Sequence, residues 1–321
     1  MRILFITATR VGDAVLSTGL LSYLSGRFPD ATFTIAAGAV AAPLFEAVPG
    51  LEKLISIKKQ RYGLHWWHLW RECAGTRWDM VIDLRRSAIG WFLRAQERHV
   101  TPKATSDHHR VELLASTLGL EETPPAPHIW LLPRHETRAA EIIPEPGRVL
   151  ALAPAANWAG KQWRPERFAD LAERLTGNGG LLAGAPIAVF AAAEERAAIE
   201  PLLDQLPADR LIDTVGDIDL PTIAACLKRC TLFVGNDSGL MHIAAASGIM
   251  TLGLFGPSRE EHYAPWGPRS GWVRTKESYD TLVGAEDFDH RTTGTLMDGL
   301  SVGRAEEAAR ALWTRIEGTQ T

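Results

Sequence analysis

The chain has 321 residues, a length that predicts about two domains or one large one. Hydrophobic residues make up 46% and charged residues 22%, as in an ordinary globular protein, and the formal net charge of −4 gives no indication of bulk nucleic-acid binding. No apolar stretch reaches the roughly 18 residues of a membrane span, and the first residues form too short an apolar run for a signal peptide. The three cysteines lack the spacing of a structural zinc site, which favours buried free thiols and a cytoplasmic protein.

Short apolar segments alternate with helical patterns along the chain, and this alternation predicts an α/β fold with parallel sheets. Apolar residues recur at helical spacing between residues 15 and 28, directly after the first predicted strand. The predicted strands of the first half are residues 3–6, 33–36, 54–57 and 80–83.

The loop after the first strand offers a carboxylate and a cation close together. It contains a single glycine rather than the three of a dinucleotide fingerprint, which argues against an NAD-dependent oxidoreductase. Asp13 stands at the predicted helix start, with Arg10 shortly before it. Two interpretations stay open for Asp13: a general base that faces a cleft, or a simple cap of the helix.

Three tryptophans stand close together in the segment 65–70, namely Trp66, Trp67 and Trp70, and several lysines and arginines flank them. If these rings are exposed, they predict contact with a sugar, a lipid or a membrane surface. If they are buried, they pack an amphipathic helix on the sheet. The sequence leaves both interpretations open.

Arg85 and Arg86 follow the predicted strand at 80–83. Ligands of open α/β sheets bind beyond the carboxyl ends of the strands, so these side chains are well placed for binding. A guanidinium group pairs readily with anionic groups. We therefore take Arg85 and Arg86, together with Arg10, as candidate residues for binding an anionic substrate that would act as the acceptor in a transfer reaction.

A proline-rich region near the middle of the chain interrupts the α/β pattern and predicts a linker. Prolines gather at residues 124–127, and Pro144 and Pro146 follow. Whether the last helix packs back on the first domain is left open. The predicted parts are an N-terminal Rossmann-like domain at 1–145, a second Rossmann-like domain at 146–300 and a C-terminal helix within 301–321.

The second half repeats the alternation of strands and helices, which predicts a second Rossmann-like domain. Its predicted strands are residues 149–153, 188–191, 232–234 and 250–255. Its predicted helices begin at residue 165 and otherwise cover 194–205, 220–229 and 302–316.

The loop before Pro165 places cations among small residues. Lys161 and Arg164 stand between a predicted strand and a helix that begins at proline, as helices often do. Cations combined with backbone N–H groups can hold a diphosphate. A solvated basic loop is the alternative interpretation.

Two acidic pairs each allow a functional and a structural interpretation. Glu194 and Glu195 follow a predicted strand, where a carboxylate can accept hydrogen bonds from ribose hydroxyls or simply favour a helix start. Asp217 and Asp219 resemble a metal-binding Asp-x-Asp pattern. Because the pair directly precedes the helix at Leu220, helix capping is the favoured interpretation, and no metal site is expected.

Residues 233–242 combine a buried strand, a tight polar turn and a helix start. Asp237 and Ser238 offer short oxygens suited to caps and turns, and Gly239 opens the helix. A helix start exposes free N–H groups and partial positive charge, which suits a phosphate. His242 lies about one turn into the helix and can reach the same ligand; an N-cap with a packed histidine is the alternative.

Taken together, these separated motifs resemble glycosyltransferase family 9, the heptosyltransferases of lipopolysaccharide core synthesis. The resemblance implies a GT-B fold, in which two Rossmann-like domains face a central cleft. It also implies inverting transfer from a nucleotide-activated sugar, typically ADP-heptose, to a lipid A–Kdo type acceptor, without cofactor or metal. The matching segments, which span almost the whole chain, are residues 12–18, 161–168, 235–242 and 254–258.

The resemblance implies roles for individual residues. Asp13 looks like the family's general base, and Lys161 looks like the lysine that contacts the donor diphosphate. Glu195, or less well Glu194, resembles the ribose-binding acid, and Ile218 falls near the nucleobase pocket. The residues that look like the donor-binding turn are Asp237, Ser238, Gly239 and His242.

The chain departs from the family's pattern in two places. Residues 155–157 read Ala-Ala-Asn where relatives often place Ser or Thr that donate to phosphate, and residues 296–300 replace a Cys-containing segment. Another nucleotide sugar, an acceptor outside lipopolysaccharide and a non-catalytic nucleotide-sugar-binding protein therefore stay open as alternatives. The expected partners are a nucleotide sugar and a glycolipid, with peripheral contact at the inner membrane as a candidate and no nucleic acid.

Overall fold

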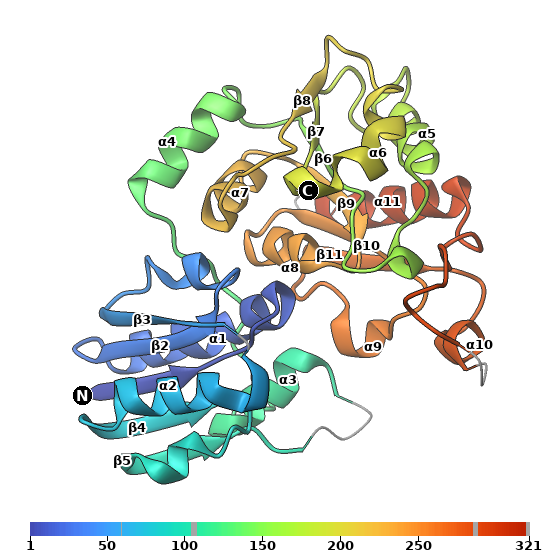
Figure 1. The fold of residues 1–321 in the computed structure, drawn as a ribbon. Coiled ribbons are helices and arrows are strands. Elements are labelled where there is room, and N and C mark those ends of the chain that lie inside the picture. Colours follow the sequence, from blue (N-terminus) through green and yellow to red (C-terminus); the bar gives the residue numbers. More distant parts are fainter. Residues whose placement is uncertain (59, 104–107, 285–287, 319–321) are drawn as a thin grey trace. The chain divides into compact units, whose positions relative to one another are not determined.

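The computed structural model describes residues 1–58, 60–103, 108–284 and 288–318. The chain forms two compact units, Met1–Leu132 (unit 1) and Pro133–Thr321 (unit 2). Each unit is built around one sheet in which every strand pairing is parallel (Figure 1). The prediction of an α/β fold with parallel sheets is therefore confirmed.

Unit 1 contains a five-stranded sheet in the order β3-β2-β1-β4-β5 (Figure 1). The central strand is apolar throughout its buried part, as expected for a parallel strand that is covered on both faces. The edge strand β5 was not predicted, because its sequence is mostly polar and lacks an apolar run. The strands are β1 (Arg2–Ile6), β2 (Thr32–Gly38), β3 (Leu51–Ile57), β4 (Arg77–Asp83) and β5 (Arg94–Val100).

In the described part of unit 1, helices α1 and α2 and several 3₁₀ turns connect these strands, and α3 follows the last strand. Helix α1 packs against α3, and α2 lies beside β3 and the 3₁₀ turn η3. The helices are α1 (Val11–Arg27), α2 (Leu64–Cys73) and α3 (Arg110–Ala115), and the 3₁₀ turns are η1 (Ala42–Phe45), η2 (Arg61–Gly63), η3 (Ile89–Phe92) and η4 (Ser116–Leu118).

Unit 2 contains a six-stranded sheet in the order β11-β10-β9-β6-β7-β8. The four middle strands carry apolar, buried residues and coincide with the predicted ones, whereas the outer strands β8 and β11 were missed. The strands are β6 (Leu150–Ala153), β7 (Ile187–Val189), β8 (Leu211–Asp213), β9 (Leu232–Asn236), β10 (Met250–Phe255) and β11 (Ser270–Arg274).

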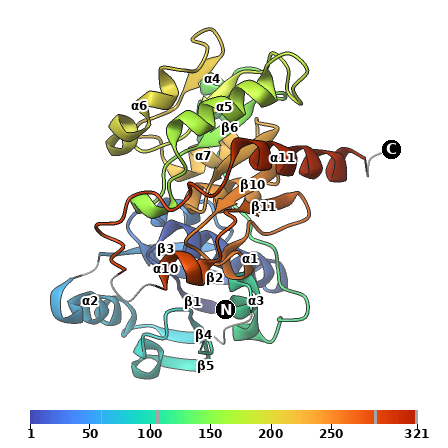
Figure 2. The same ribbon diagram turned by 90° about the vertical axis from the view of Figure 1, so that its right-hand side faces the viewer.

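The helices of unit 2 cover its sheet. The last helix, α11, runs beside β10 and β11 and also packs against α5 (Figure 2). Trp163 and Phe168 fill the core near α5, with ring centroids 5.1 Å apart. The helices are α4 (Pro133–Ile142), α5 (Pro165–Thr176), α6 (Arg196–Leu203), α7 (Leu220–Leu227), α8 (Gly239–Ala246), α9 (Glu260–Tyr263), α10 (Tyr279–Val283) and α11 (Val302–Glu317), with 3₁₀ turns η5 (Ala159–Lys161) and η6 (Ala193–Glu195).

The units divide between Leu132 and Pro133, earlier than the boundary at residue 145 that the prolines suggested. Helix α4 belongs to unit 2 because it packs against α7. The guanidinium of Arg229 strengthens this attachment, donating to the carbonyl oxygens of Ile143 at 2.5 Å and Pro144 at 2.6 Å. Pro144 and Pro146 therefore follow the end of α4, whereas the prolines at 124–127 lie shortly before the division between units.

The three cysteines are buried free thiols, as predicted. Burial raises the pKa of Cys73 and of Cys226 to about 12 and raises that of Cys230 as well, so all three stay protonated near neutral pH. In the part of the chain that the structure describes, no helix combines the length and the apolar character needed to cross a bilayer.

Helix α1 allows a sharp test of packing in unit 1. A Cβ atom at Gly19 would lie 2.1 Å from the Pro125 carbonyl oxygen, whereas one at Gly26, in the same helix, would meet nothing within 4 Å. We expect Gly19→Ala to lower the free energy of unfolding by about 1–3 kcal/mol through overpacking. Gly26→Ala, the matched control, should raise it by up to about 1 kcal/mol because alanine favours the helix. Denaturant unfolding measures both, and equal effects of the two variants would contradict the close contact.

Candidate active site

The predicted binding residues of unit 2 lie in loops that follow neighbouring strands. Strands β10, β9, β6 and β7 are adjacent in the sheet and parallel, so their carboxyl ends share one edge. Lys161 follows β6, Glu195 follows β7, and Asp237 follows β9 directly. Ligands of such sheets bind at this edge, so the topology places these loops where a ligand would bind.

Lys161 and Asp237 form an ion pair, although they are 76 positions apart in the chain. Their side chains are largely buried, with 19% and 6% of their surfaces exposed. The pairing orients the ammonium group at the end of the short turn η5 and supplies a partner for the buried carboxylate. The sequence analysis predicted both as binding residues but did not predict that they contact each other.

Asn236 joins the two loops that carry this ion pair. Its side-chain oxygen accepts from the Trp163 backbone N–H at 3.2 Å, and its amide nitrogen donates to the Pro154 carbonyl at 2.6 Å. The side chain is completely buried, so unmade hydrogen bonds there would be costly. Asn236 thus holds the loop after β6 against the end of β9.

The start of α8 provides unused hydrogen-bonding groups. Ser238 precedes the helix, but its hydroxyl makes no capping bond to the first turn. Among the described residues, the buried Ser238 Oγ has no hydrogen-bond partner. The first N–H groups of a helix carry partial positive charge, so this turn has the chemistry of an anion site.

His242 and Glu195 occupy more ordinary surroundings. His242 is 4% exposed and lies beside Tyr263, with ring centroids 6.5 Å apart. Glu195 Oε2 accepts from the Ala192 N–H at 2.9 Å, which agrees with the helix-start interpretation of this acid. Its neighbour Glu194 is exposed.

Asp219 caps helix α7, which confirms the favoured interpretation of the Asp-x-Asp pattern. Asp219 Oδ1 accepts from the Thr222 N–H at 2.8 Å, and Oδ2 accepts from the Thr222 hydroxyl at 2.9 Å. Across the described residues, no group of three His, Cys, Asp or Glu side chains is arranged to hold a metal ion.

In unit 1, Asp13 faces a cation and does not act as a helix cap. It is the third residue of α1, and Arg10, in the capping position, makes no side-chain cap. Asp13 Oδ1 lies 3.6 Å from Arg110 Nε, beyond hydrogen-bonding distance. Both atoms are buried, and neither has a hydrogen-bond partner among the described residues. Asp13 therefore lies beside a cation, and its Oδ1 makes no capping hydrogen bond.

The candidate acceptor-binding arginines differ in their surroundings. Arg10 and Arg86 are exposed, whereas Arg85 is half-buried with its guanidinium 4.9 Å from the Trp66 ring centroid. Burial lowers the pKa of Arg85, and the charge of Asp83 opposes this effect. Asp83 also shapes the loop, because its carboxylate accepts from the Arg85 N–H at 2.9 Å.

The sequence model of glycosyltransferase family 9 (heptosyltransferase) matches residues 72–288 of the chain. The chain belongs to glycosyltransferase family 9. It is therefore a glycosyltransferase, as the motifs predicted.

Relatives and solved structures agree with the family assignment. The chain is 25% identical to lipooligosaccharide heptosyltransferase 2 of Haemophilus influenzae, over 86% of this chain and 89% of the relative. A family 9 glycosyltransferase of Veillonella parvula superposes with a TM-score of 0.80 at 21% identity, covering 98% of this chain and 97% of the other. The ADP-heptose lps heptosyltransferase II of E. coli gives 0.76 at 20% identity, covering 99% and 100%. These likenesses confirm the predicted GT-B fold.

Residues 296–300 have a structural role. Asp298 makes two 2.6 Å bonds with Arg164, and the Leu300 carbonyl accepts from Trp163 Nε1 at 2.9 Å. Leu296 N donates to the Gly160 carbonyl at 3.0 Å. Residues 296–300 therefore brace the loop that carries Lys161, a role that no local sequence signal indicated.

The Asp298–Arg164 pair predicts a pH-dependent contribution to stability. Hydrogen bonds from Arg164 hold the pKa of Asp298 below its ordinary value of 3.8. Because the pKa is lower in the folded state, the ion pair contributes its full stabilisation at pH values above the ordinary pKa. This contribution is lost as the pH falls through the pKa of the folded state. Because the pair is half-exposed, Asp298→Asn should cost at most about 1 kcal/mol at pH 6 and less at pH 3.

Denaturant unfolding of both proteins at the two pH values measures this difference. Asp170→Asn, an exposed change on α5 in which the structure describes no ion pair, is the matched control. A difference between wild type and Asp298→Asn that grows on acidification would contradict the prediction.

Proposed function

We propose that this family 9 member is an inverting heptosyltransferase that moves a heptose from ADP-heptose to a lipopolysaccharide core acceptor of the lipid A–Kdo type. The names of its relatives, which include heptosyltransferase 2 enzymes and an ADP-heptose transferase, support this substrate class. The observation that carries the mechanism is the buried Asp13 oxygen at the start of α1, which lacks a hydrogen-bond partner among the described residues. Because the proposed acceptor is a glycolipid, we place the enzyme in the cytoplasm, at the surface of the inner membrane.

Asp13 acts as the general base in this proposal. The acceptor hydroxyl gives its proton to the Asp13 carboxylate while its oxygen attacks the anomeric carbon. The bond from that carbon to the diphosphate oxygen breaks, and ADP leaves with the bonding electrons. Attack opposite to the leaving group inverts the anomeric configuration. Arg110, 3.6 Å from the carboxylate, orients it, and Arg10, Arg85 and Arg86 are proposed to hold anionic groups of the acceptor.

The donor groups of unit 2 would stabilise the leaving diphosphate. Lys161 supplies a cation that Asp237 already orients, and the N–H groups at Gly239, with the Ser238 hydroxyl, supply neutral donors. Glu195 has a second carboxylate oxygen to offer to a ribose hydroxyl. His242 is proposed to line the same donor site, within the first turn of α8.

Metal independence is part of the proposal. Lys161 and the start of α8 would provide the positive charge that a divalent cation provides in other nucleotide-sugar enzymes. Transfer should therefore continue in EDTA, and a loss that Mg²⁺ or Mn²⁺ restores would overturn this point.

Asp13→Asn keeps the shape of the side chain and removes the base. We expect kcat for heptose transfer to fall about 10²- to 10⁴-fold while the Kd for ADP-heptose stays within a factor of about two. Release of ADP in a coupled assay measures kcat, and calorimetry measures Kd. Asp170→Asn, a change at an exposed carboxylate on α5, is the matched control and should behave as wild type. An equal loss of donor binding in Asp13→Asn would show that Asp13 holds the donor rather than acts as a base.

Lys161→Ala tests the donor site and its nucleotide. The wild type should bind ADP in preference to UDP, GDP and NAD, and the variant should bind ADP about 10- to 100-fold more weakly because a charge-assisted contact is lost. Lys228→Ala, an exposed lysine that follows α7, is the control. A preference for UDP or GDP would assign another donor sugar, and unchanged affinity of Lys161→Ala would remove this lysine from the site.

A further inference from the structure

Exposed large apolar side chains gather on one part of unit 1. Ten such side chains are described as exposed, and six of them fall between residues 62 and 92. Single exposed apolar residues are normal on a protein surface, but a contiguous group indicates an interaction site. This group, named the aromatic face, consists of Tyr62, Leu64, Trp67, Trp70, Trp91 and Phe92.

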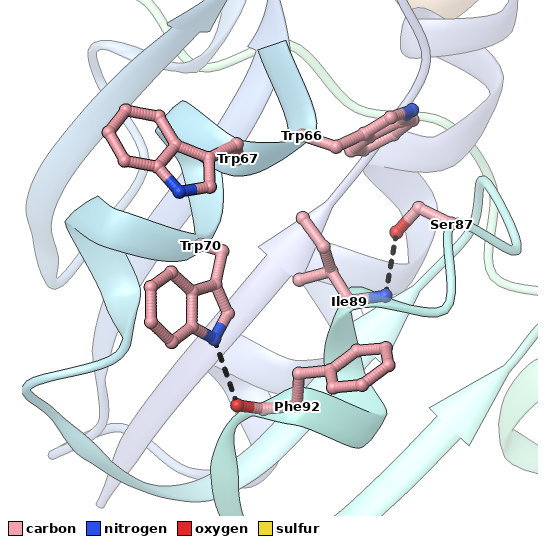
Figure 3. A pocket seen from close by; sticks show the side chains of 6 residues that line it. All are labelled: Trp66, Trp67, Trp70, Ser87, Ile89 and Phe92. Atoms are coloured by element: carbon pink, nitrogen blue, oxygen red, sulfur yellow. Dashed lines mark hydrogen bonds between the residues drawn. The ribbon is translucent and has the colours of Figure 1, made fainter. Parts of the chain in front are cut away.

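The aromatic face borders a cavity of about 410 Å³ between α2 and η3. Figure 3 shows Trp67 and Trp70 on α2 and Ile89 and Phe92 on η3. Five of the six lining residues are apolar. The sixth is Ser87, whose hydroxyl is already bonded to Asp83 at 2.7 Å. A sugar would need polar partners for its hydroxyl groups, so the cavity suits hydrocarbon better.

Hydrogen bonds fix the Trp70 ring and the backbone that carries Trp91 and Phe92. Trp70 Nε1 donates to the Phe92 carbonyl at 3.0 Å and thereby links α2 to η3 (Figure 3). The guanidinium of Arg98 donates to three backbone carbonyls between η3 and the start of β5, those of Gly90 at 2.8 Å, Leu93 at 2.8 Å and Ala95 at 3.0 Å. These bonds fix the backbone on both sides of Trp91 and Phe92, so little loop ordering remains to be lost on binding.

The surroundings of the aromatic face are basic, in contrast to the whole chain. Residues 58–98 contain nine Lys or Arg and four Asp or Glu, a balance of +5, whereas the chain as a whole carries −4. Arg71 also stacks on the face, with its guanidinium 5.6 Å from the Trp67 ring centroid. The described cations of this segment that are exposed are Lys58, Arg61, Arg71, Arg77, Arg86 and Arg94.

We propose that the aromatic face is a docking surface for an anionic lipid bilayer. Tryptophan and tyrosine rings prefer the boundary between headgroups and acyl chains, and flanking cations pair with lipid phosphates. The complementary charge and the apolar cavity argue for a bilayer rather than for a glycan or an acidic protein. The proposed function places the enzyme at the inner membrane because its acceptor is a glycolipid. This inference rests on that proposal and names the surface of unit 1 that contacts the bilayer.

The test uses the purified full chain and vesicles that contain no glycolipid acceptor, so its result is independent of heptose transfer. Wild type should co-sediment with vesicles of phosphatidylglycerol and phosphatidylethanolamine, less with phosphatidylcholine alone, and less at high salt. Trp91→Ala combined with Phe92→Ala should lower the partition coefficient about 10- to 100-fold. Arg61→Glu should lower it about 5- to 10-fold.

Matched controls separate docking from general effects of the substitutions. Trp272→Ala, on β11 of unit 2, removes a side chain that is 48% exposed and should leave vesicle binding unchanged. Lys228→Glu is the control for charge reversal, and thermal unfolding checks that every variant folds. Absence of wild-type binding to anionic vesicles, or equal loss in Trp272→Ala, would overturn the proposal. A self-association that only the Trp91 and Phe92 substitutions abolish, without vesicle binding, would instead assign the face to contact between copies of the chain.

Discussion

The parallel pairing of β6 with β9 is the constraint on which the candidate donor site depends. Parallel strands end at the same edge of a sheet, so the loops after β6 and β9 become neighbours although they are far apart in the chain. This proximity allows the ion pair between Lys161 and Asp237 and the two bonds of Asn236. The buried carboxylate and amide in turn require these partners, because an unpaired polar group at this depth would be costly.

A second layer of contacts supports the same loop from the end of the chain. Asp298 and the Leu300 carbonyl hold Arg164 and Trp163, while α11 covers β10 and β11 nearby. Precise placement of a charged group matters for transfer chemistry, because small displacements of a binding group weaken catalysis strongly. The C-terminal segment therefore contributes to the site by holding the Lys161 loop in place.

Unit 1 combines two chemically different features. Asp13 and Arg110 form a partly buried polar pair, in which each facing atom is left without a hydrogen bond among the described residues. The aromatic face instead presents rings and cations to solvent on elements that Trp70 and Arg98 lock together. Under the proposed function, the first feature performs proton transfer and the second brings the enzyme to the membrane in which its acceptor resides.

Local signals in the sequence were sufficient for most of the fold. Apolar runs identified the central strands of both sheets, and the Asp219 cap was recognised because it depends on residues three positions away. The edge strands β5, β8 and β11 were not predicted from the sequence, because strands at the border of a sheet need less apolar surface. The units divide within the proline-containing region predicted as a linker, and α4 joins unit 2 through contacts with α7 and Arg229 that no local pattern encodes.

By itself, the sequence determined the α/β class, the family resemblance and the residue types offered for binding, because strand, helix and cap preferences act over a few neighbouring residues. Only the tertiary structure decided that Lys161 meets Asp237, that Asp13 faces Arg110 and that Trp67 is exposed. These outcomes depend on which distant segments the folded chain brings together. The physical reason is that burial and ion pairing depend on packing between distant segments, which local preferences hardly determine.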